Sequence, residues 1–196
     1  PMTSRPHIVV LAGPNGAGKS TTAPALLRGQ LGIDEFVNAD TIACGLSAFA
    51  PERAAIDAGR VMLRRLDPLA AQQRSFAFET TLASRSFAPR IVRWIKAGYC
   101  AHLVFLWLPN ADLALARVRE RVLLGGHDVP ADTVRRRYAR GLRNFFSLYR
   151  ELATTWRFYD NSNRRLRPVA RGESTGHLTV YAPALWSEIM EVQHGE

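Results

Sequence analysis

The chain has 196 residues, 47% of them hydrophobic, and a formal net charge of +9 at pH 7. This length and apolar content predict a single compact domain over residues 1–196 with a hydrophobic core of its own. No run of about eighteen apolar residues occurs and the N-terminus lacks the pattern of a signal peptide, so we expect a cytoplasmic protein without membrane insertion. The positive charge indicates an anionic ligand or partner: a nucleotide, a nucleic acid or an acidic protein.

The first predicted element is a buried strand over residues 7–12 that leads directly into a glycine-rich loop. The loop matches the pattern G-x-x-x-x-G-K-[ST] at every position. Its glycines let backbone N–H groups point toward phosphate oxygens, and the helix that follows presents its positive end to the same ligand. The expected nucleotide-binding residues are Gly13, Pro14, Asn15, Gly16, Ala17, Gly18, Lys19, Ser20 and Thr21.

Two residues of this loop have distinct chemical roles. We expect Lys19 to reach the β- and γ-phosphates as a catalytic point charge, and the Ser20 hydroxyl to join the coordination of Mg²⁺. Only Lys19 and Lys96 are lysines among the 26 basic residues, so a compact ammonium group stands where the loop requires one. The alternative is a glycine-rich turn without a ligand, which Lys19 argues against. ATP and Mg²⁺ are the predicted cofactors.

Helices and strands alternate after the loop, as in an α/β fold. We expect a helix over residues 18–28, a short strand over 35–40 and an amphipathic helix over 51–73, in which Pro68 is a candidate break. The later predicted elements are a strand over 75–81, a helix over 86–97, a central strand over 100–108, helices over 111–124 and 132–153, strands over 155–160 and 178–181, and a helix from residue 183. This order predicts a P-loop NTPase of the kinase-like class, with a mostly parallel central sheet flanked by helices and a helical lid.

Acidic side chains stand at the ends of two predicted strands. Asp40 ends the strand over residues 35–40, and Glu79 lies near the end of the strand over 75–81. Open α/β sheets place their ligand sites at such strand ends. Asp40 could instead cap the next helix, and Glu79 could be a surface carboxylate or the partner of an arginine. The central strand over 100–108 ends without an acid, which argues against a transporter-type or motor-type ATPase.

An arginine-rich segment over residues 117–143 has the pattern of a mobile lid. Arg117 and Arg121 lie one turn apart on a predicted helix, and a Gly-Gly-His sequence then forms a flexible break. Such a segment could close over the transferring phosphoryl group, exclude water and bring positive charge to it. The alternative is a solvated basic face on a core helix. The lid residues expected to act in catalysis are Arg121 and Arg137, and those expected to bind the substrate are Arg136 and Arg140.

The order of these features resembles the zeta toxin family of small P-loop kinases, over roughly residues 7–162. The motifs that carry the resemblance are the phosphate loop, residues 38–40, residues 78–81, the arginine helix, residues 125–127 and residues 135–138. The resemblance implies ATP-dependent phosphorylation of a hydroxyl on a small molecule, the best-known substrate being UDP-N-acetylglucosamine. It implies that Asp40 is the catalytic base and also contacts the substrate, and that Glu79 and Thr80 lie on the substrate side. The basic surface would suit an acidic antitoxin-like protein.

Three other functions remain open from the sequence. A kinase of another metabolite, such as a nucleotide, a dinucleotide or a sugar, would use the same residues. A polynucleotide kinase or RNA-binding ATPase would account for the charge of +9, but the aromatic residues are not interleaved with the arginines as in a stacking module. A non-catalytic, nucleotide-gated interaction module would bind ATP without acceptor-dependent turnover.

Overall fold

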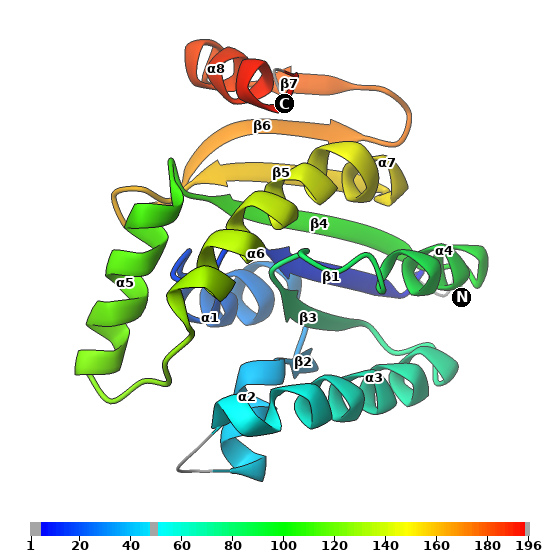
Figure 1. Cartoon of the computed structure of the whole chain (residues 1–196). Coiled ribbons are helices and arrows are strands. Elements are labelled where there is room, and N and C mark those ends of the chain that lie inside the picture. The colour runs from blue at the N-terminus through cyan, green and yellow to red at the C-terminus, as the bar shows by residue number, and fades with distance from the viewer. Residues whose placement is uncertain (1–4, 48–50, 195–196) are drawn as a thin grey trace.

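A seven-stranded sheet forms the centre of the computed structural model, which describes residues 5–47 and 51–194 (Figure 1). Its strand order is β2-β3-β1-β4-β5-β6-β7. Strands β1 to β5 run parallel to one another, and β6 and β7 are antiparallel additions at one edge. The strands are β1 (His7–Ala12), β2 (Phe36–Val37), β3 (Phe76–Thr80), β4 (Cys100–Trp107), β5 (Thr155–Asp160), β6 (Arg167–Glu173) and β7 (Leu178–Val180). The predicted mostly parallel α/β fold is confirmed.

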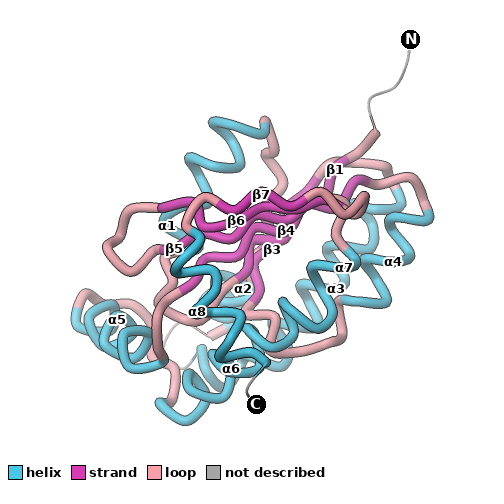
Figure 2. Tube along the Cα trace, turned by 90° about the horizontal axis from the view of Figure 1, so that it is seen from above, coloured by secondary structure: helices cyan, strands magenta, loops and turns pink. Residues whose placement is uncertain are grey.

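Helices cover both faces of this sheet (Figure 2). The helical segments are α1 (Lys19–Ala23), η1 (Pro24–Gln30), α2 (Ala39–Leu46), η2 (Pro51–Ala54), α3 (Ala55–Ala71), α4 (Ala88–Lys96), α5 (Ala111–Leu123), α6 (Ala131–Asn144), η3 (Phe145–Tyr149), α7 (Arg150–Leu152) and α8 (Pro183–His194). Helices α3, α4 and α8 pack on one face, and α1, η1 and α5 pack on the other, while α6 contributes Leu142 to the first core cluster and Val134 to the second. Within the described ranges, none of the helices combines the length and the apolar character of a membrane span.

The core follows from the alternation of side chains along β1. Ile8 and Val10 point to the face covered by α3 and α4, whereas Val9 and Leu11 point to the face covered by η1 and α5. All four are buried, because a parallel strand with helices on both sides has no solvated face. The apolar sequence of this strand therefore places the phosphate loop at the edge of the sheet where the parallel strands end.

Several element boundaries differ from the prediction. Strand β2 ends at Val37, and the side chain of Asn38, not Asp40, caps α2: its Oδ1 accepts hydrogen bonds from Asp40 N at 2.8 Å and Thr41 N at 3.4 Å. The alternative in which Asp40 is the helix cap is therefore wrong. Helix α3 continues through Pro68 without the predicted break, and α6 starts after Pro130 with no side-chain cap.

Two histidines pair across β1 and β4 at the edge of the sheet opposite the phosphate loop. His7 Nδ1 lies 2.9 Å from His102 Nε2, and His102 Nδ1 lies 2.8 Å from Thr155 Oγ1. Burial lowers the pKa of His102, and the positive charges of His7 and Arg157 lower it further. The folded protein therefore favours the neutral imidazole at position 102.

We expect this pair to make stability depend on pH. The unfolded chain takes up a proton at His102 as the pH falls below about 6.5, whereas His102 in the folded chain stays neutral to lower pH. The contribution of His102 to the free energy of unfolding is therefore present above that pH and lost on acidification. The midpoint of thermal unfolding should fall less between about pH 7.5 and pH 5.5 in His102→Gln than in the unchanged protein. His177→Gln, at an exposed position, is the control. An equal fall in all three proteins would contradict this assignment.

Candidate active site

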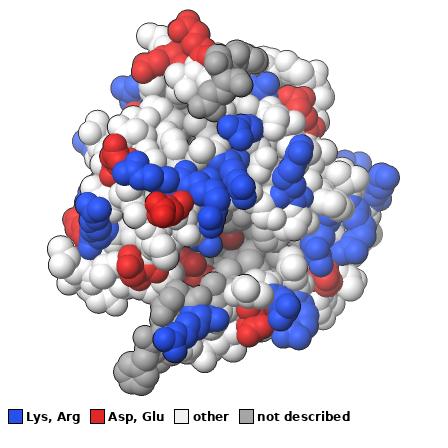
Figure 3. All heavy atoms as spheres, viewed as in Figure 1, with Lys and Arg blue, Asp and Glu red and all other residues white. Residues whose placement is uncertain are grey.

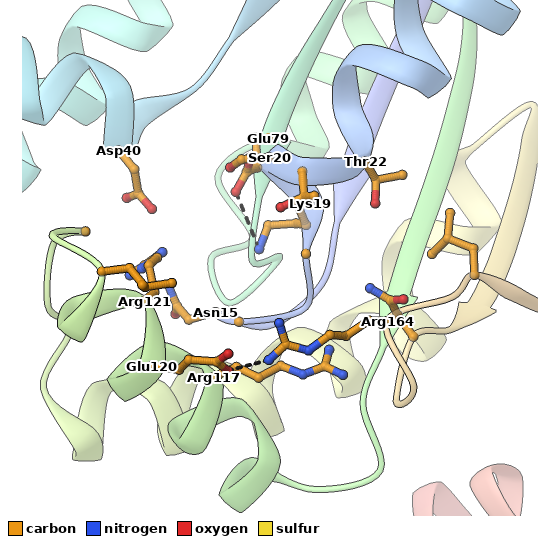
Figure 4. A pocket seen from close by; sticks show the side chains of 17 residues that line it. Asn15, Lys19, Ser20, Thr22, Asp40, Glu79, Arg117, Glu120, Arg121 and Arg164 are labelled. Carbon is orange, nitrogen blue, oxygen red and sulfur yellow. Dashed lines mark hydrogen bonds and ion pairs between the residues drawn. The ribbon is translucent and has the colours of Figure 1, made fainter.

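A cavity of about 460 Å³ lies where the parallel strands end (Figure 4). The segments that meet there are the phosphate loop with the start of α1, the first turn of α2, the end of β3, helix α5 with the residues that follow it, and the loop between β5 and β6. The residues that line it are Asn15, Gly16, Gly18, Lys19, Ser20, Thr21, Thr22, Asp40, Glu79, Arg117, Glu120, Arg121, Leu124, Gly126, Asn161, Arg164 and Leu166. Segments far apart in the sequence meet because parallel strands share one carboxyl edge.

The phosphate loop is held closely against β4 and α5. A Cβ atom at Gly13 would lie 2.3 Å from Leu106 O, and one at Gly16 would lie 2.7 Å from Ala114 O. Both glycines also have positive φ, of 140° and 78°, which other residues rarely adopt. The glycines of the motif are thus required by space as well as by backbone conformation.

Lys19 lies inside this loop with only 5% of its side chain exposed. Its Nζ donates hydrogen bonds to Gly13 O and Pro14 O, each at 2.9 Å, and lies 3.5 Å from Glu79 Oε1. A buried ammonium group needs such partners, because an unpaired buried charge is costly. The loop carbonyls and Glu79 therefore fix a positive charge at the place where the motif binds phosphate.

Glu79, on β3, contacts residues that follow both neighbouring strands: Lys19 and Ser20 after β1, and Asn38 after β2. Its Oε2 accepts a hydrogen bond from Ser20 Oγ at 2.8 Å and another from Asn38 Nδ2 at 2.8 Å. These contacts link Glu79 to Ser20 of the phosphate loop and to Asn38 after β2, and the substrate-side role that the resemblance implies for Glu79 stays a prediction. A hydroxyl and a carboxylate are the oxygen ligands that Mg²⁺ prefers, so Ser20 and Glu79 fit a magnesium ion shared with phosphate oxygens.

Asp40 faces these groups from across the cavity. It lies in the first turn of α2, and Figure 4 shows its carboxylate pointing toward Arg121 and Asn15. Because Asn38 caps the helix, the Asp40 side chain makes no hydrogen bond or ion pair within the part of the chain that the structure describes. Its role as the catalytic base stays a prediction.

The loop between α5 and α6 holds Arg121 in the cavity wall. Arg121 Nη2 donates a hydrogen bond to His127 O at 2.8 Å, and a Cβ atom at Gly126 would lie 2.5 Å from Arg121 Cγ. Its buried Nε has no hydrogen-bond partner among the described residues, and the same holds for Oδ1 of Asn15. Buried polar atoms are normally paired, so a ligand in this cavity could satisfy both.

The opposite end of the cavity contains Asn161 and Arg164, which the sequence analysis missed, beside Arg117, which it had assigned to the lid. Asn161, at the end of β5, donates from Nδ2 to Ala17 O at 2.8 Å. Arg117 donates to Ser162 O at 2.6 Å, and Arg164 pairs with Glu120, so α5 is tied to the β5–β6 loop beside the phosphate loop.

Burial and the charge of Arg164 lower the pKa of Arg117. The polar sequence that follows the strand over residues 155–160 was the available signal for this end of the cavity, of the same kind that singled out Asp40 and Glu79.

The other predicted site residues lie outside the cavity lining. Thr80 Oγ1 accepts a hydrogen bond from Leu82 N at 3.0 Å, which stabilises the turn after β3. On α6, Arg136 donates to Thr133 Oγ1 at 3.4 Å and Arg140 is exposed, while Arg137 is half-buried. Figure 3 shows basic side chains gathered over α6, beside a hollow in the surface. The binding and catalytic roles of these residues stay predictions.

Residues 8–148 match the AAA domain family, and the chain belongs to this family. It is 32% identical over 132 residues to an uncharacterized protein of Haemophilus influenzae, a match that covers 66% of this chain and 91% of that protein.

Solved structures show the same fold at low sequence identity. The AvrRxo1-ORF1:-ORF2 complex with ATP has a TM-score of 0.75 at 17% identity; the match covers 94% of this chain but only 63% of that one. The PezAT chromosomal toxin-antitoxin system of Streptococcus pneumoniae has a TM-score of 0.64 at 16% identity, over 98% of this chain and 86% of that one. A gluconokinase from Sinorhizobium meliloti 1021 has a TM-score of 0.51 at 16% identity, over 80% and 82%. The predicted kinase-like P-loop fold and its zeta-toxin-like character are confirmed at the level of the fold.

We predict that Glu79→Gln lowers the effect of Mg²⁺ on ATP binding. The substitution removes a negative charge that repels phosphate when no metal is present and helps to hold the metal when it is present. The ratio of ATP affinities with and without Mg²⁺, measured by calorimetry, should fall by about tenfold. Glu188→Gln, on the exposed side of α8, is the control, and an unchanged ratio in Glu79→Gln would exclude a role for Glu79 at the metal.

Proposed function

We propose that this protein is an ATP-dependent kinase that phosphorylates a hydroxyl group of a small anionic metabolite, of the class of nucleotide sugars such as UDP-N-acetylglucosamine. The observation that carries the proposal is the arrangement of the cavity. Lys19, Ser20 and Glu79 form a phosphate-binding wall, and the free carboxylate of Asp40 faces it from α2 (Figure 4). We propose that Asp40 is the proton acceptor for a hydroxyl that binds between it and this wall.

The residues of the cavity would divide the reaction between them. Asp40 accepts the proton of the acceptor hydroxyl while the oxygen of that hydroxyl forms a bond to the γ-phosphorus of ATP. The bond between the γ-phosphorus and the bridging oxygen of the β-phosphate breaks, and ADP is released. Lys19 and Arg121 stabilise the negative charge on the transferring group from two sides. Bound Mg²⁺ would supply further charge neutralisation on the phosphate oxygens. Most of the rate then comes from placement of the two substrates and from electrostatics.

The basic side chains on α6 support an anionic acceptor. They gather beside the surface hollow in Figure 3, and the whole chain carries +9. We propose that Arg136 and Arg140 contact the acceptor, and that Arg137 joins Arg121 in stabilising the transferring group, when residues 117–143 act as a lid. The segment between α5 and α6 is mostly exposed, apart from Val129, whereas α6 itself buries Val134 and Leu142.

A second protein is part of the proposal. AvrRxo1-ORF1 is crystallised with ORF2, and PezAT is a toxin-antitoxin system. By analogy, and because of the net charge of +9, we propose an acidic partner protein for this chain. Use of ATP as the phosphate donor fits a location in the cytoplasm.

The experiment that tests the function is turnover of ATP against a panel of nucleotide sugars, nucleotides and dinucleotides, with the products weighed by mass spectrometry. The proposal expects one added phosphate on a nucleotide sugar. If only nucleotides or dinucleotides are phosphorylated, the proposed acceptor class is wrong. ATP binding without any phosphorylated acceptor would refute the proposed kinase activity.

We predict that Asp40→Asn lowers turnover with the best acceptor by about 10²-fold to 10⁴-fold, because the proton acceptor is lost. The affinity for MgATP, measured by calorimetry, should stay unchanged, since Asp40 lies across the cavity from the phosphate loop. Asp57→Asn is the matched control, because Asp57 is an exposed carboxylate on α3 that pairs with Arg60. Equal turnover in Asp40→Asn and Asp57→Asn would remove Asp40 from the mechanism.

A further inference from the structure

The loop that follows Glu79 has a backbone conformation that needs outside support. Leu82 has φ of 57° although it is not glycine, and its side chain is 0% exposed. This left-handed conformation is an outlier for a bulky residue and persists only where surrounding contacts fix it. Two threonine hydroxyls supply local support: Thr80 Oγ1 accepts from Leu82 N at 3.0 Å, and Thr81 Oγ1 accepts from Ala83 N at 3.4 Å.

Further support comes from the helical stretch of α6 and η3. Asn144, which is buried, donates from Nδ2 to Leu82 O at 2.7 Å. Tyr149, also buried, donates its hydroxyl to Ser84 O at 2.7 Å. At Gly141 the helix comes so close that a Cβ atom would lie 2.2 Å from Thr81 O. Three residues of one helical stretch thus contact residues 81, 82 and 84.

The π-helical turn η3 explains how one helix reaches the loop twice. Asn144 and Tyr149 are five residues apart, and in an α-helix of about 3.6 residues per turn they would point in clearly different directions. The i→i+5 bonding of the π-turn over Phe145–Tyr149 widens this turn and brings the two side chains toward the same side. Short π-turns of this kind occur frequently at functional sites.

The donor at Tyr149 is insensitive to pH in the physiological range. Burial raises the pKa of Tyr149 to about 12, so the phenol keeps its proton and continues to donate to Ser84 O. The amide of Asn144 has no charge to lose. The hydrogen bonds that these two side chains donate to the loop therefore do not change with pH in the physiological range.

We infer that Asn144 and Tyr149, with the close approach at Gly141, are positioning residues that hold the Glu79 carboxylate against Ser20 and Lys19 through the loop over residues 81–84. The inference rests on the part of the proposed function that places MgATP in the phosphate loop. Glu79 lies only two residues before this loop, and its contacts to Ser20 and Lys19 depend on where β3 ends. A small displacement of such a carboxylate lowers the affinity of the site for its ligand far more than it lowers the stability of the fold.

The chain offers a matched pair of variants for the test. Tyr149→Phe removes only the hydroxyl that bonds to Ser84 O. Tyr138→Phe removes a comparable hydroxyl, which donates to Leu108 O at 2.8 Å and whose pKa burial also raises to about 12. Both residues lie on the same helical stretch, but only Tyr149 contacts the loop after Glu79. Any general loss of packing or stability should affect both variants alike.

The measurement is the ratio of ATP affinities with and without Mg²⁺, by calorimetry on the full chain. Tyr149→Phe should lower this ratio by about tenfold, as substitutions behind a metal-binding group commonly do, and Tyr138→Phe should leave it unchanged. In the Glu79→Gln background, Tyr149→Phe should have no further effect, because the group that it positions is already altered.

Equal effects of the two tyrosine variants, or an undiminished effect of Tyr149→Phe in the Glu79→Gln background, would overturn the inference. Gly141→Ala gives a second approach, since the added methyl group would press on Thr81 O; Gly59→Ala, which meets no atom within 4 Å, is its control. Because the readout is binding, a failure to find phosphoryl transfer would refute the kinase proposal without deciding this one.

Discussion

The buried charge of Lys19 is the constraint on which the site depends. Its ammonium group lies in the phosphate loop at the end of β1, and two loop carbonyls and Glu79 compensate it. This is possible because β1 and β3 are adjacent and parallel, with Leu11 opposite Glu79 in the register. The strand order thus brings a carboxylate next to the lysine, and without this pairing the buried ammonium group would lack a compensating negative charge, which is costly.

The Glu79 carboxylate lies between the part of the site next to α2 and the part next to α6. Toward β2, Asn38 bonds to Glu79 and caps α2, which leaves the carboxylate of Asp40 free to face the cavity. Toward α6, the loop after Glu79 is held by Asn144 and Tyr149, on the helix that carries the exposed arginines. The phosphate wall, the proposed base and the arginine helix are therefore parts of one bonded arrangement.

The sequence predicted what depends on local pattern. The strands β1 and β4 are largely apolar runs, and the phosphate loop is contiguous, so the strands and the loop could be recognised without knowledge of the fold. Strand β6 could not, because its basic sequence contains Pro168 and becomes a strand only by pairing with β5. The sequence also could not show that Asn38 and not Asp40 caps α2. Either side chain can cap a helix, and which one does so depends on the residue at which the helix begins.

Site residues divide in the same way. Lys19, Ser20, Asp40 and Glu79 follow strands that the pattern identifies, so their meeting at one sheet edge could be predicted. The spacing of Arg136 and Arg140 predicts a shared helix face but not what that face contacts. Asn161 and Arg164 lie more than a hundred residues after the phosphate loop in the sequence, and the π-turn at η3 contacts the loop after β3 through Tyr149. The polar sequence after β5 was a signal for Asn161 and Arg164, whereas the π-turn has no strong local signal.

The most direct test of this account is a calorimetric titration of MgATP into the unchanged protein, Lys19→Ala and Lys96→Ala. Lys96 is the other lysine of the chain and is exposed at the end of α4, so it controls for loss of a single positive charge. The account predicts that Lys19→Ala weakens MgATP binding by at least about thirtyfold, or about 2 kcal/mol, while Lys96→Ala binds like the unchanged protein. Equal affinity in Lys19→Ala, or no MgATP binding by the unchanged protein, would contradict it.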